Sequence, residues 1–151
     1  MGDDMDDIKI LLVDDEEDFV STLSERLSLR DLNSQAASSG EEALQFVGDH
    51  VPDIIVLDLK MPGIDGMEVL RRVKQHFPAI QVLILTGHGN DLDEAEARKL
   101  GAFDYLRKPV DIELLVARIR EAYQELKKSS NMSAVAYAEA GEFDTAAKMA
   151  N

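Results

Sequence analysis

The sequence predicts an α/β fold in which five parallel strands form one doubly wound sheet covered by helices. Five short apolar segments alternate along the chain with five amphipathic segments, a pattern typical of βα units joined by right-handed crossovers. The strongest apolar segments are continuous, as in strands that are buried on both faces. Four of the five apolar segments are followed by a polar or charged residue, and such ends meet at one edge of a parallel sheet.

The predicted strands are short runs rich in apolar and β-branched residues, bounded by turn formers. They lie at residues 8–13, 34–37, 54–57, 81–85 and 102–107. The second is the weakest, whereas 54–57 and 81–85 have the unbroken apolar character of central strands. Under the rules for parallel βα units, these strands form a flavodoxin-like (βα)5 sheet with the order 2-1-3-4-5.

Each predicted strand is followed by a segment with apolar residues at helical spacing. The predicted helices lie at residues 16–29, from Ser39 to just before Pro52, and at 66–77, 91–100 and 111–126. Ser39 is a candidate N-cap, with Glu42 three positions later as in a capping box. Gly101 is placed to end the fourth helix and Asp111 to cap the fifth, so three of the five helices have a local signal at one end.

The central part of the chain, residues 8–128, is predicted to be one domain. Residues 1–7 are expected to be a disordered acidic start. Residues 129–133, Ser-Ser-Asn-Met-Ser, are expected to be a hinge, and an Ala-rich helical tail follows, split into two short pieces by Gly141. Two interpretations of the tail stay open: a frayed end, or a helical hairpin that docks on the domain or on a partner.

Composition argues against several functions. The formal net charge is −14, and nine of the first eighteen residues are acidic, so direct binding of nucleic acid or anionic lipid is not expected. Without cysteine, the chain has no disulfide and no thiolate metal site. It has no apolar run of about 20 residues and no signal-peptide pattern, which favours a cytoplasmic protein away from membranes. The 23 residues after Lys128 are too few for a DNA-binding output domain.

The polar residues at the strand ends predict a site that binds a phosphoryl group. Asp14, Asp15 and Asp58 bring three carboxylates together, and these hard oxygen ligands suit Mg²⁺, with Mn²⁺ as a substitute. Lys108 supplies a positive charge, and Thr86 supplies a hydroxyl donor. An aspartate in such a site can attack phosphorus and form an aspartyl phosphate, while the cation and the lysine neutralise the transferred group.

Four segments carry this chemistry, in the order 13–15, 58–66, 85–89 and 101–109. Together they resemble the receiver domain of two-component response regulators, over about residues 8–127. The resemblance implies that Asp58 accepts a phosphoryl group from a sensor histidine kinase or a phosphotransfer protein. It also implies a phosphorylation-controlled switch and not an enzyme, apart from self-phosphorylation by small phosphodonors and autodephosphorylation.

The resemblance implies a role for each metal-site residue. Asp15, Asp58 and the main-chain carbonyl of Lys60 would bind Mg²⁺ directly, and Asp14 would act largely through water. Lys60 lies two positions after Asp58, and His88 lies two positions after the strand-end threonine. We predict that Lys60 and His88 flank the phosphoryl group and set the lifetime of the phosphorylated state. The other two histidines are assigned no role.

The switch residues are also implied by the resemblance. Lys108 would pair with the phosphoryl group, and its peptide bond to Pro109 would be cis. Thr86 would swing towards a phosphoryl oxygen, and Tyr105 would rotate inward behind it. The output face would consist of residues 91–100, the strand through Tyr105, and residues 111–126. That face would control a downstream protein and could also form a phosphorylation-linked homodimer.

Two other functions stay open at the level of sequence. The first is a receiver-like interaction module that is never phosphorylated. The complete set of acids, hydroxyl and lysine described above argues against it, because such a module would not need them. A Mg²⁺-dependent aspartyl-phosphate phosphatase of the haloacid dehalogenase type would need a second aspartate two positions after Asp58, where Lys60 stands. Two arrangements of the whole protein also stay open: a receiver that stands alone, or the front part of a longer regulator.

Overall fold

The computed structural model describes the backbone of residues 7–140 and the side chains of residues 7–129. The strands are β1 (Ile10–Val13), β2 (Ser34–Ala37), β3 (Ile54–Leu57), β4 (Gln81–Thr86) and β5 (Asp104–Arg107). The helices are α1 (Glu17–Ser28), α2 (Gly40–Asp49), α3 (Gly66–His76), α4 (Asp91–Lys99) and α5 (Ile112–Ala140). All ten elements were predicted, most of them within two residues of their observed limits.

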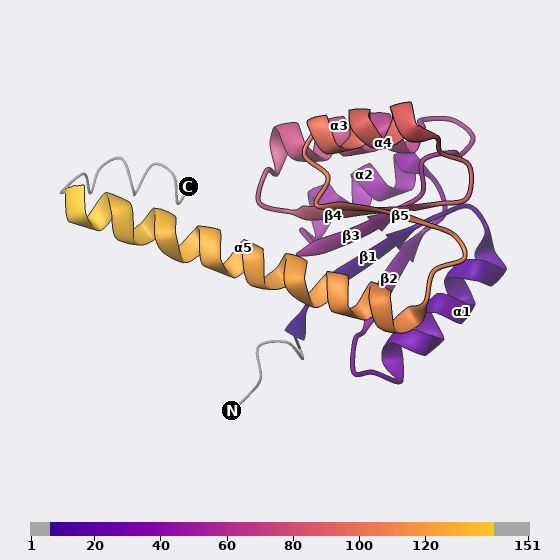
Figure 1. Cartoon of the computed structure of the whole chain (residues 1–151), viewed down its shortest axis with the longest axis horizontal. Helices are drawn as coiled ribbons and strands as arrows, with labels where there is room; N and C mark the ends of the chain where they lie inside the picture. Colours follow the sequence, from indigo (N-terminus) through magenta and orange to yellow (C-terminus); the bar gives the residue numbers. More distant parts are fainter. Residues whose placement is uncertain (1–6, 141–151) are drawn as a thin grey trace.

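The five strands form one parallel sheet with the order β2-β1-β3-β4-β5, which confirms the predicted fold class and strand order. Figure 1 shows α2, α3 and α4 on one face of this sheet and α1 and α5 on the other. Because every strand runs in the same direction, the carboxyl ends of β1, β3, β4 and β5 lie along one edge. That edge is where the predicted site residues should meet.

The core consists of two layers, one on each face of the sheet. The four side chains of β3 alternate between them: Ile54 and Val56 pack in the layer under α1 and α5, while Ile55 and Leu57 pack under α2 and α3. All four are buried, at no more than 4% exposure. A strand that contributes to both layers must be apolar at every position, which explains the unbroken run in the sequence.

The helix-capping signals predicted from the sequence act largely as expected. The Ser39 side chain accepts a hydrogen bond from the backbone N–H of Glu42 at 3.1 Å. Glu42 reaches back to the backbone N–H of Ser38 at 2.7 Å, one residue before the position that a standard capping box would use. Asp111 accepts from the N–H of Leu114 at 3.2 Å, and Gly101, at φ +107°, follows the end of α4.

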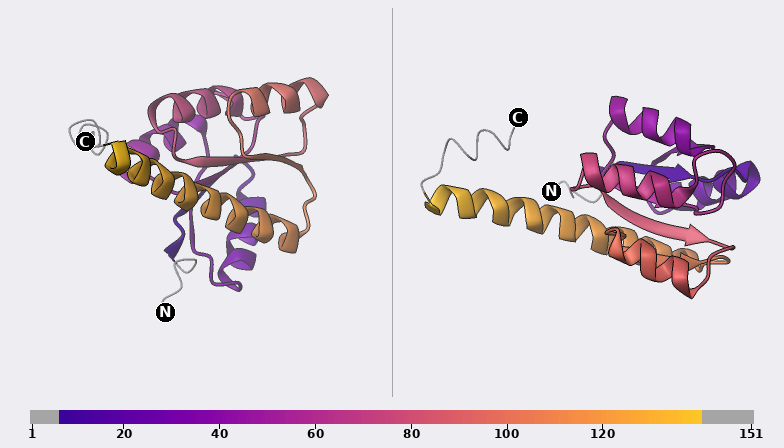
Figure 2. Two further views of the ribbon diagram at one scale, coloured as in Figure 1. Left: turned by 60° about the vertical axis from the view of Figure 1, so that its left-hand side comes forward. Right: turned by 90° about the horizontal axis from the view of Figure 1, so that it is seen from above.

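The carboxyl-terminal helix differs from the prediction. We expected a hinge at residues 129–133, but α5 continues through this segment to Ala140. Serine and asparagine lower helix propensity by only about 0.5 kcal/mol per residue, and the segment contains neither glycine nor proline to break the backbone pattern. Figures 1 and 2 show this part of α5 extending beyond the sheet and the other helices.

Some sequence expectations concern residues outside the described part of the chain. The acidic start is described only at residue 7, and the second piece of the predicted tail, after Gly141, is not described. The boundary predicted at residue 128 stays a prediction. None of the helices in the described part combines the length and apolar character that crossing a bilayer requires.

Candidate functional site

Three acidic side chains meet at the carboxyl edge of the sheet, as predicted. Val13 of β1 pairs in register with Leu57 of β3, so Asp14 and Asp58 follow at the same level of adjacent strands. Carboxylate oxygens of Asp14, Asp15 and Asp58 all lie within 4.8 Å of one another. Sequence separation alone would not bring these groups together, whereas the parallel register does.

The three carboxylates differ in their surroundings. Asp14 and Asp58 are buried, at 5% and 3% exposure, while Asp15 is exposed. The Oδ1 atom of Asp58 is buried without a hydrogen-bond partner in the described structure. Burial raises the pKa of Asp58 above its ordinary value, with a contribution from the negative charge of Asp14, while the Thr86 hydroxyl and the charge of Lys108 oppose the rise. A buried carboxylate oxygen without a donor is a position where a cation fits.

Lys108 follows β5 and reaches back across the edge of the sheet. Its Nζ atom lies 2.6 Å from Oδ2 of Asp14 and 2.8 Å from Oε1 of Glu16, and it stands 4.2 Å from the centre of the Phe19 ring. Burial alone would lower the pKa of Lys108, but the hydrogen bonds to the two carboxylates outweigh it and raise the pKa. Lys108 is therefore a firmly protonated group at the centre of the site.

Glu16 and Phe19 were missed as site residues by the sequence analysis. Their positions suggested only a helix start and an apolar helical face. The signal available was the position of Glu16 directly after the pair Asp14 and Asp15, since a third acid there shares their loop. In the structure the hydrogen bond from the Glu16 N–H to Oδ1 of Asp14, 2.9 Å long, fixes this loop.

Thr86 and Tyr105 lie next to each other behind the acidic group. Thr86, at the end of β4, is 1% exposed, and its Oγ1 accepts a hydrogen bond from the N–H of His88 at 3.3 Å. Tyr105 is 6% exposed, and its hydroxyl is buried without a hydrogen-bond partner in the described structure. A Cβ atom added to Gly89 would lie 1.6 Å from the Tyr105 hydroxyl oxygen and 3.2 Å from Cγ2 of Thr86. Gly89 therefore leaves the space that the inward tyrosine occupies.

Two backbone features complete the edge of the site. The peptide bond between Lys108 and Pro109 is cis, the isomer implied by the resemblance, and the Lys108 N–H donates to the Thr86 carbonyl at 2.9 Å. At the start of α3, a Cβ atom added to Gly66 would lie 2.1 Å from the carbonyl oxygen of Asp58. The start of α3 thus packs directly against the backbone of Asp58 and Leu59.

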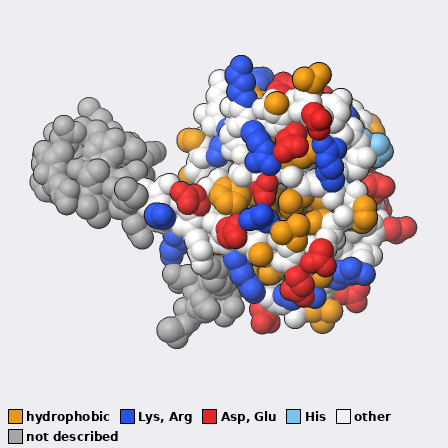
Figure 3. All heavy atoms as spheres, in the orientation of Figure 1, with side chains coloured by type: hydrophobic (Ala, Val, Ile, Leu, Met, Phe, Trp, Pro, Cys, Tyr) orange, Lys and Arg blue, Asp and Glu red, His pale blue; other side chains and the backbone are white. Residues whose placement is uncertain are grey.

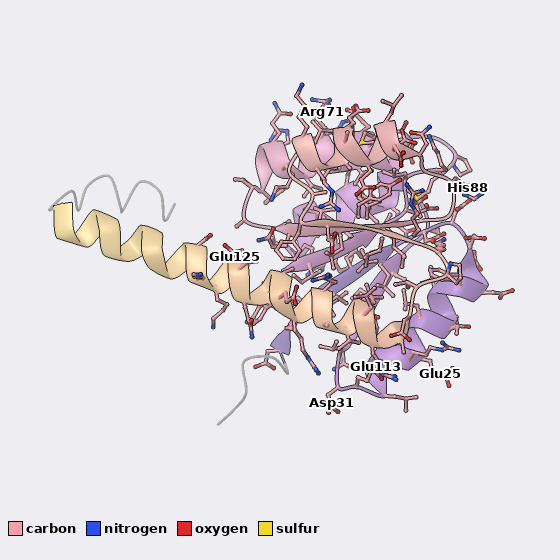
Figure 4. All side chains as sticks on the ribbon, in the orientation of Figure 1. Glu25, Asp31, Arg71, His88, Glu113 and Glu125 are labelled. Atoms are coloured by element: carbon pink, nitrogen blue, oxygen red, sulfur yellow. The ribbon has the colours of Figure 1, made fainter. Side chains whose placement is uncertain are left out.

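The two predicted lifetime-setting residues lie on the outside of the site. Lys60 and His88 are both exposed, and Figure 4 shows His88 on the loop after β4. The ammonium group of Lys60 is 3.8 Å from a carboxylate oxygen of Asp93 in α4. Their effect on the lifetime of a phosphorylated state stays a prediction.

The expected output face carries many ion pairs within the chain. Arg98 pairs with Glu94 at 3.0 Å and with Asp104 at 3.2 Å, and Asp104 also pairs with Arg118 of α5 at 3.0 Å. These contacts connect α4, β5 and α5 directly. Figure 3 shows acidic and basic side chains interspersed on this side of the molecule. The homodimer through this face stays a prediction.

Comparison with protein families and curated relatives gives a consistent result. A family model described as the response regulator receiver domain matches residues 10–120. The DNA-binding transcriptional regulator NtrC of Escherichia coli is 37% identical over 127 residues, which cover 82% of this chain and 27% of that protein. The transcriptional regulatory protein CpxR of Klebsiella pneumoniae is 42% identical over 112 residues, covering 74% of this chain and 47% of that protein. The chain thus spans between about a quarter and a half of these relatives.

Solved structures agree with the family match. The response regulator receiver domain protein from Clostridium thermocellum has a TM-score of 0.76 and 37% identity, covering 80% of this chain and 97% of that chain. NtrX from Brucella abortus has a TM-score of 0.78 and 29% identity, covering 84% of this chain and 29% of that chain. With the family model matching most of the described domain, the chain belongs to the response regulator receiver domain family of two-component signalling proteins.

Proposed function

We propose that Asp58 accepts a phosphoryl group with the help of Mg²⁺, and that the resulting charge switches the face formed by α4, β5 and α5. The observation that supports this most is the buried Asp58 oxygen without a partner, beside two further carboxylates and a protonated lysine. Buried charges of this kind lower the stability of the fold, and such a cost is typical of a functional site.

The acidic group fits a hard divalent cation. Its three carboxylates lie close enough to share one ion, and the unpartnered oxygen of Asp58 needs a positive partner. Asp15, Asp58 and the main-chain carbonyl of Lys60 would hold Mg²⁺ directly and Asp14 through water, with Mn²⁺ as a substitute. The cation would neutralise negative charge on the transferred phosphoryl oxygens.

The proposed reaction is a transfer from a phosphohistidine of a sensor kinase or phosphotransfer protein. An Asp58 carboxylate oxygen attacks phosphorus, the N–P bond of the donor breaks, and its electron pair returns to the imidazole nitrogen. The product is an acyl phosphate on Asp58. Lys108 would pair with one phosphoryl oxygen and the Thr86 hydroxyl would donate to another, with Tyr105 packed behind it.

The partners follow from the same proposal. A cognate kinase would supply the phosphoryl group, and a downstream protein or an output domain would read the switched face. Some relatives are named as transcriptional regulators and are longer than this chain. The acidic net charge of −14 makes direct nucleic-acid binding by this chain unfavourable, so we propose output through protein contacts. The cytoplasmic location expected from the sequence stays a prediction.

The test is incubation of the full chain with acetyl phosphate and Mg²⁺, followed by intact-mass measurement. The expected result is addition of one phosphoryl group that is absent in Asp58→Asn and absent when EDTA replaces Mg²⁺. No modification of the wild type would favour the interaction module that is never phosphorylated. Rapid release of free phosphate without a lasting acyl phosphate would favour the phosphatase.

A further inference from the structure

Lys108 is shared between two carboxylates of different character. Its Nζ atom lies 2.6 Å from Asp14 and 2.8 Å from Glu16, whereas no described ion pair joins it to Asp58. We propose that Glu16 is a positioning residue that restrains the ammonium group of Lys108 before phosphorylation and so slows the reaction at Asp58. This inference rests on the proposed function, in which Lys108 must turn to the phosphoryl group.

The two carboxylates differ in how easily they can release the lysine. The Asp14 side chain is 6% exposed, so losing its partner would leave a buried charge uncompensated. The Glu16 side chain is 58% exposed and can be solvated as soon as the lysine leaves. Lys108 therefore keeps Asp14 and gives up Glu16 when a dianionic group arrives.

The surroundings of Lys108 support a restraint of this kind. The Phe19 ring of α1 lies 4.2 Å from its ammonium nitrogen, and Glu16, the residue before α1, contributes a carboxylate to the same group. The loop that carries Glu16 is fixed by the hydrogen bond from its N–H to Asp14, 2.9 Å long. Glu16 thus holds the lysine from a defined position at the start of α1.

The simpler explanation is that Glu16 is one of several acidic residues at a helix amino end. Glu17 provides the matched control for this explanation, because it is the next residue, is also exposed and has no described contact with Lys108. Glu16→Gln and Glu17→Gln change the net charge by the same amount. A general effect of charge on Mg²⁺ or on the phosphodonor would therefore appear equally in both variants.

The experiment measures the initial rate of phosphorylation by acetyl phosphate at saturating Mg²⁺. Glu16→Gln is expected to raise the rate about two- to fivefold, the range set by the energy of an exposed ion pair, while Glu17→Gln stays at the wild-type rate. The gain should shrink as salt rises towards 1 M, where the screening length falls to about 3 Å. A merely structural role of Glu16 would not produce this dependence on salt.

An NMR spectrum of the lysine ammonium groups gives an independent readout. The Lys108 signal is expected to move in Glu16→Gln and to stay in place in Glu17→Gln. Equal rates in the two variants, or a slower rate in Glu16→Gln, would overturn the restraint while leaving the phosphoacceptor role intact. A wild type that acetyl phosphate does not modify would overturn the proposed function, and the inference with it.

Discussion

Replacing Asp58 by asparagine should stabilise the domain when no divalent cation is present. The substitution keeps the size of the side chain and removes the charge. In the wild type, the charged carboxylate is 3% exposed, lies close to Asp14, and has one oxygen without a hydrogen-bond partner in the described structure. The neutral amide avoids both the burial of charge and the repulsion from Asp14.

The size of the effect follows from the unpartnered oxygen. Leaving a buried polar group unsatisfied costs about 1–3 kcal/mol, and an amide in the same place recovers only part of that cost. We therefore expect the free energy of unfolding to rise by about 1–2 kcal/mol in Asp58→Asn. For a domain of this size, such a gain corresponds to an increase in Tm of about 3–8 °C.

The pH dependence has a defined sign. Burial raises the pKa of Asp58 in the folded state, so the folded protein keeps a proton that the unfolded chain has already lost. The stability of the wild type therefore falls as pH rises from about 4, the ordinary value of the unfolded carboxyl, through the raised pKa of the folded state. The advantage of Asp58→Asn should grow over this interval and stay constant above it.

The assay is thermal unfolding in EDTA and in Mg²⁺ between pH 4 and 8. Mg²⁺ at about 100 times its Kd should stabilise the wild type by about 2.7 kcal/mol and Asp58→Asn by much less, which removes or reverses the difference. Glu125→Gln removes an equal charge from an exposed position of α5 and should match the wild type in both conditions. The reasoning is refuted if Asp58→Asn in EDTA is no more stable than Glu125→Gln.

Three further predictions address the rest of the site. Lys108→Met should lower the rate of phosphorylation by acetyl phosphate about 10²-fold, measured by intact mass, because it removes the ammonium group whose charge acts on Asp58. Gly89→Ala should displace Tyr105 from its buried position. Because burial raises the pKa of Tyr105 in the wild type, spectrophotometric titration of the variant should find that pKa closer to its ordinary value. Gly66→Ala should lower the free energy of unfolding by about 1–3 kcal/mol in denaturant melts, since the added carbon would meet the backbone of Asp58.

Most of the fold was predictable because its signals are local. The unbroken apolar run at β3 is typical of a strand that packs against both core layers, and this pattern predicts that β3 lies at the centre of the sheet. The residues after β1 and β3 could then be placed side by side from the parallel register alone. The acidic group and the position of Lys108 near it followed from topology, with no knowledge of side-chain contacts.

The contacts within the site were not predictable in the same way. Glu16 and Lys108 are 92 positions apart, and the place of Glu16 directly after Asp14 and Asp15 indicates a shared loop but not a contact with Lys108. The space beside Tyr105 depends on the missing side chain of Gly89, which the sequence suggests only as part of a loop. The hinge expected at residues 129–133 is helical in the structure. Serine and asparagine lower helix propensity too little to end α5 there.

The arrangement of charge in the site also implies an order of events. The site holds four carboxylates, those of Asp14, Asp15, Glu16 and Asp58, and the ammonium group of Lys108 contacts two of them, Asp14 and Glu16. A phosphoryl donor brings further negative charge. Its approach is therefore unfavourable until a divalent cation has neutralised part of the negative charge of the carboxylates. Under the proposed function, the cation must therefore bind before the phosphoryl group is transferred, and Lys108 leaves Glu16 when the phosphoryl group arrives. The Mg²⁺ concentration that gives half of the maximal phosphorylation rate should then equal the Kd fitted from the rise in stability with Mg²⁺, because both report occupation of the same three carboxylates.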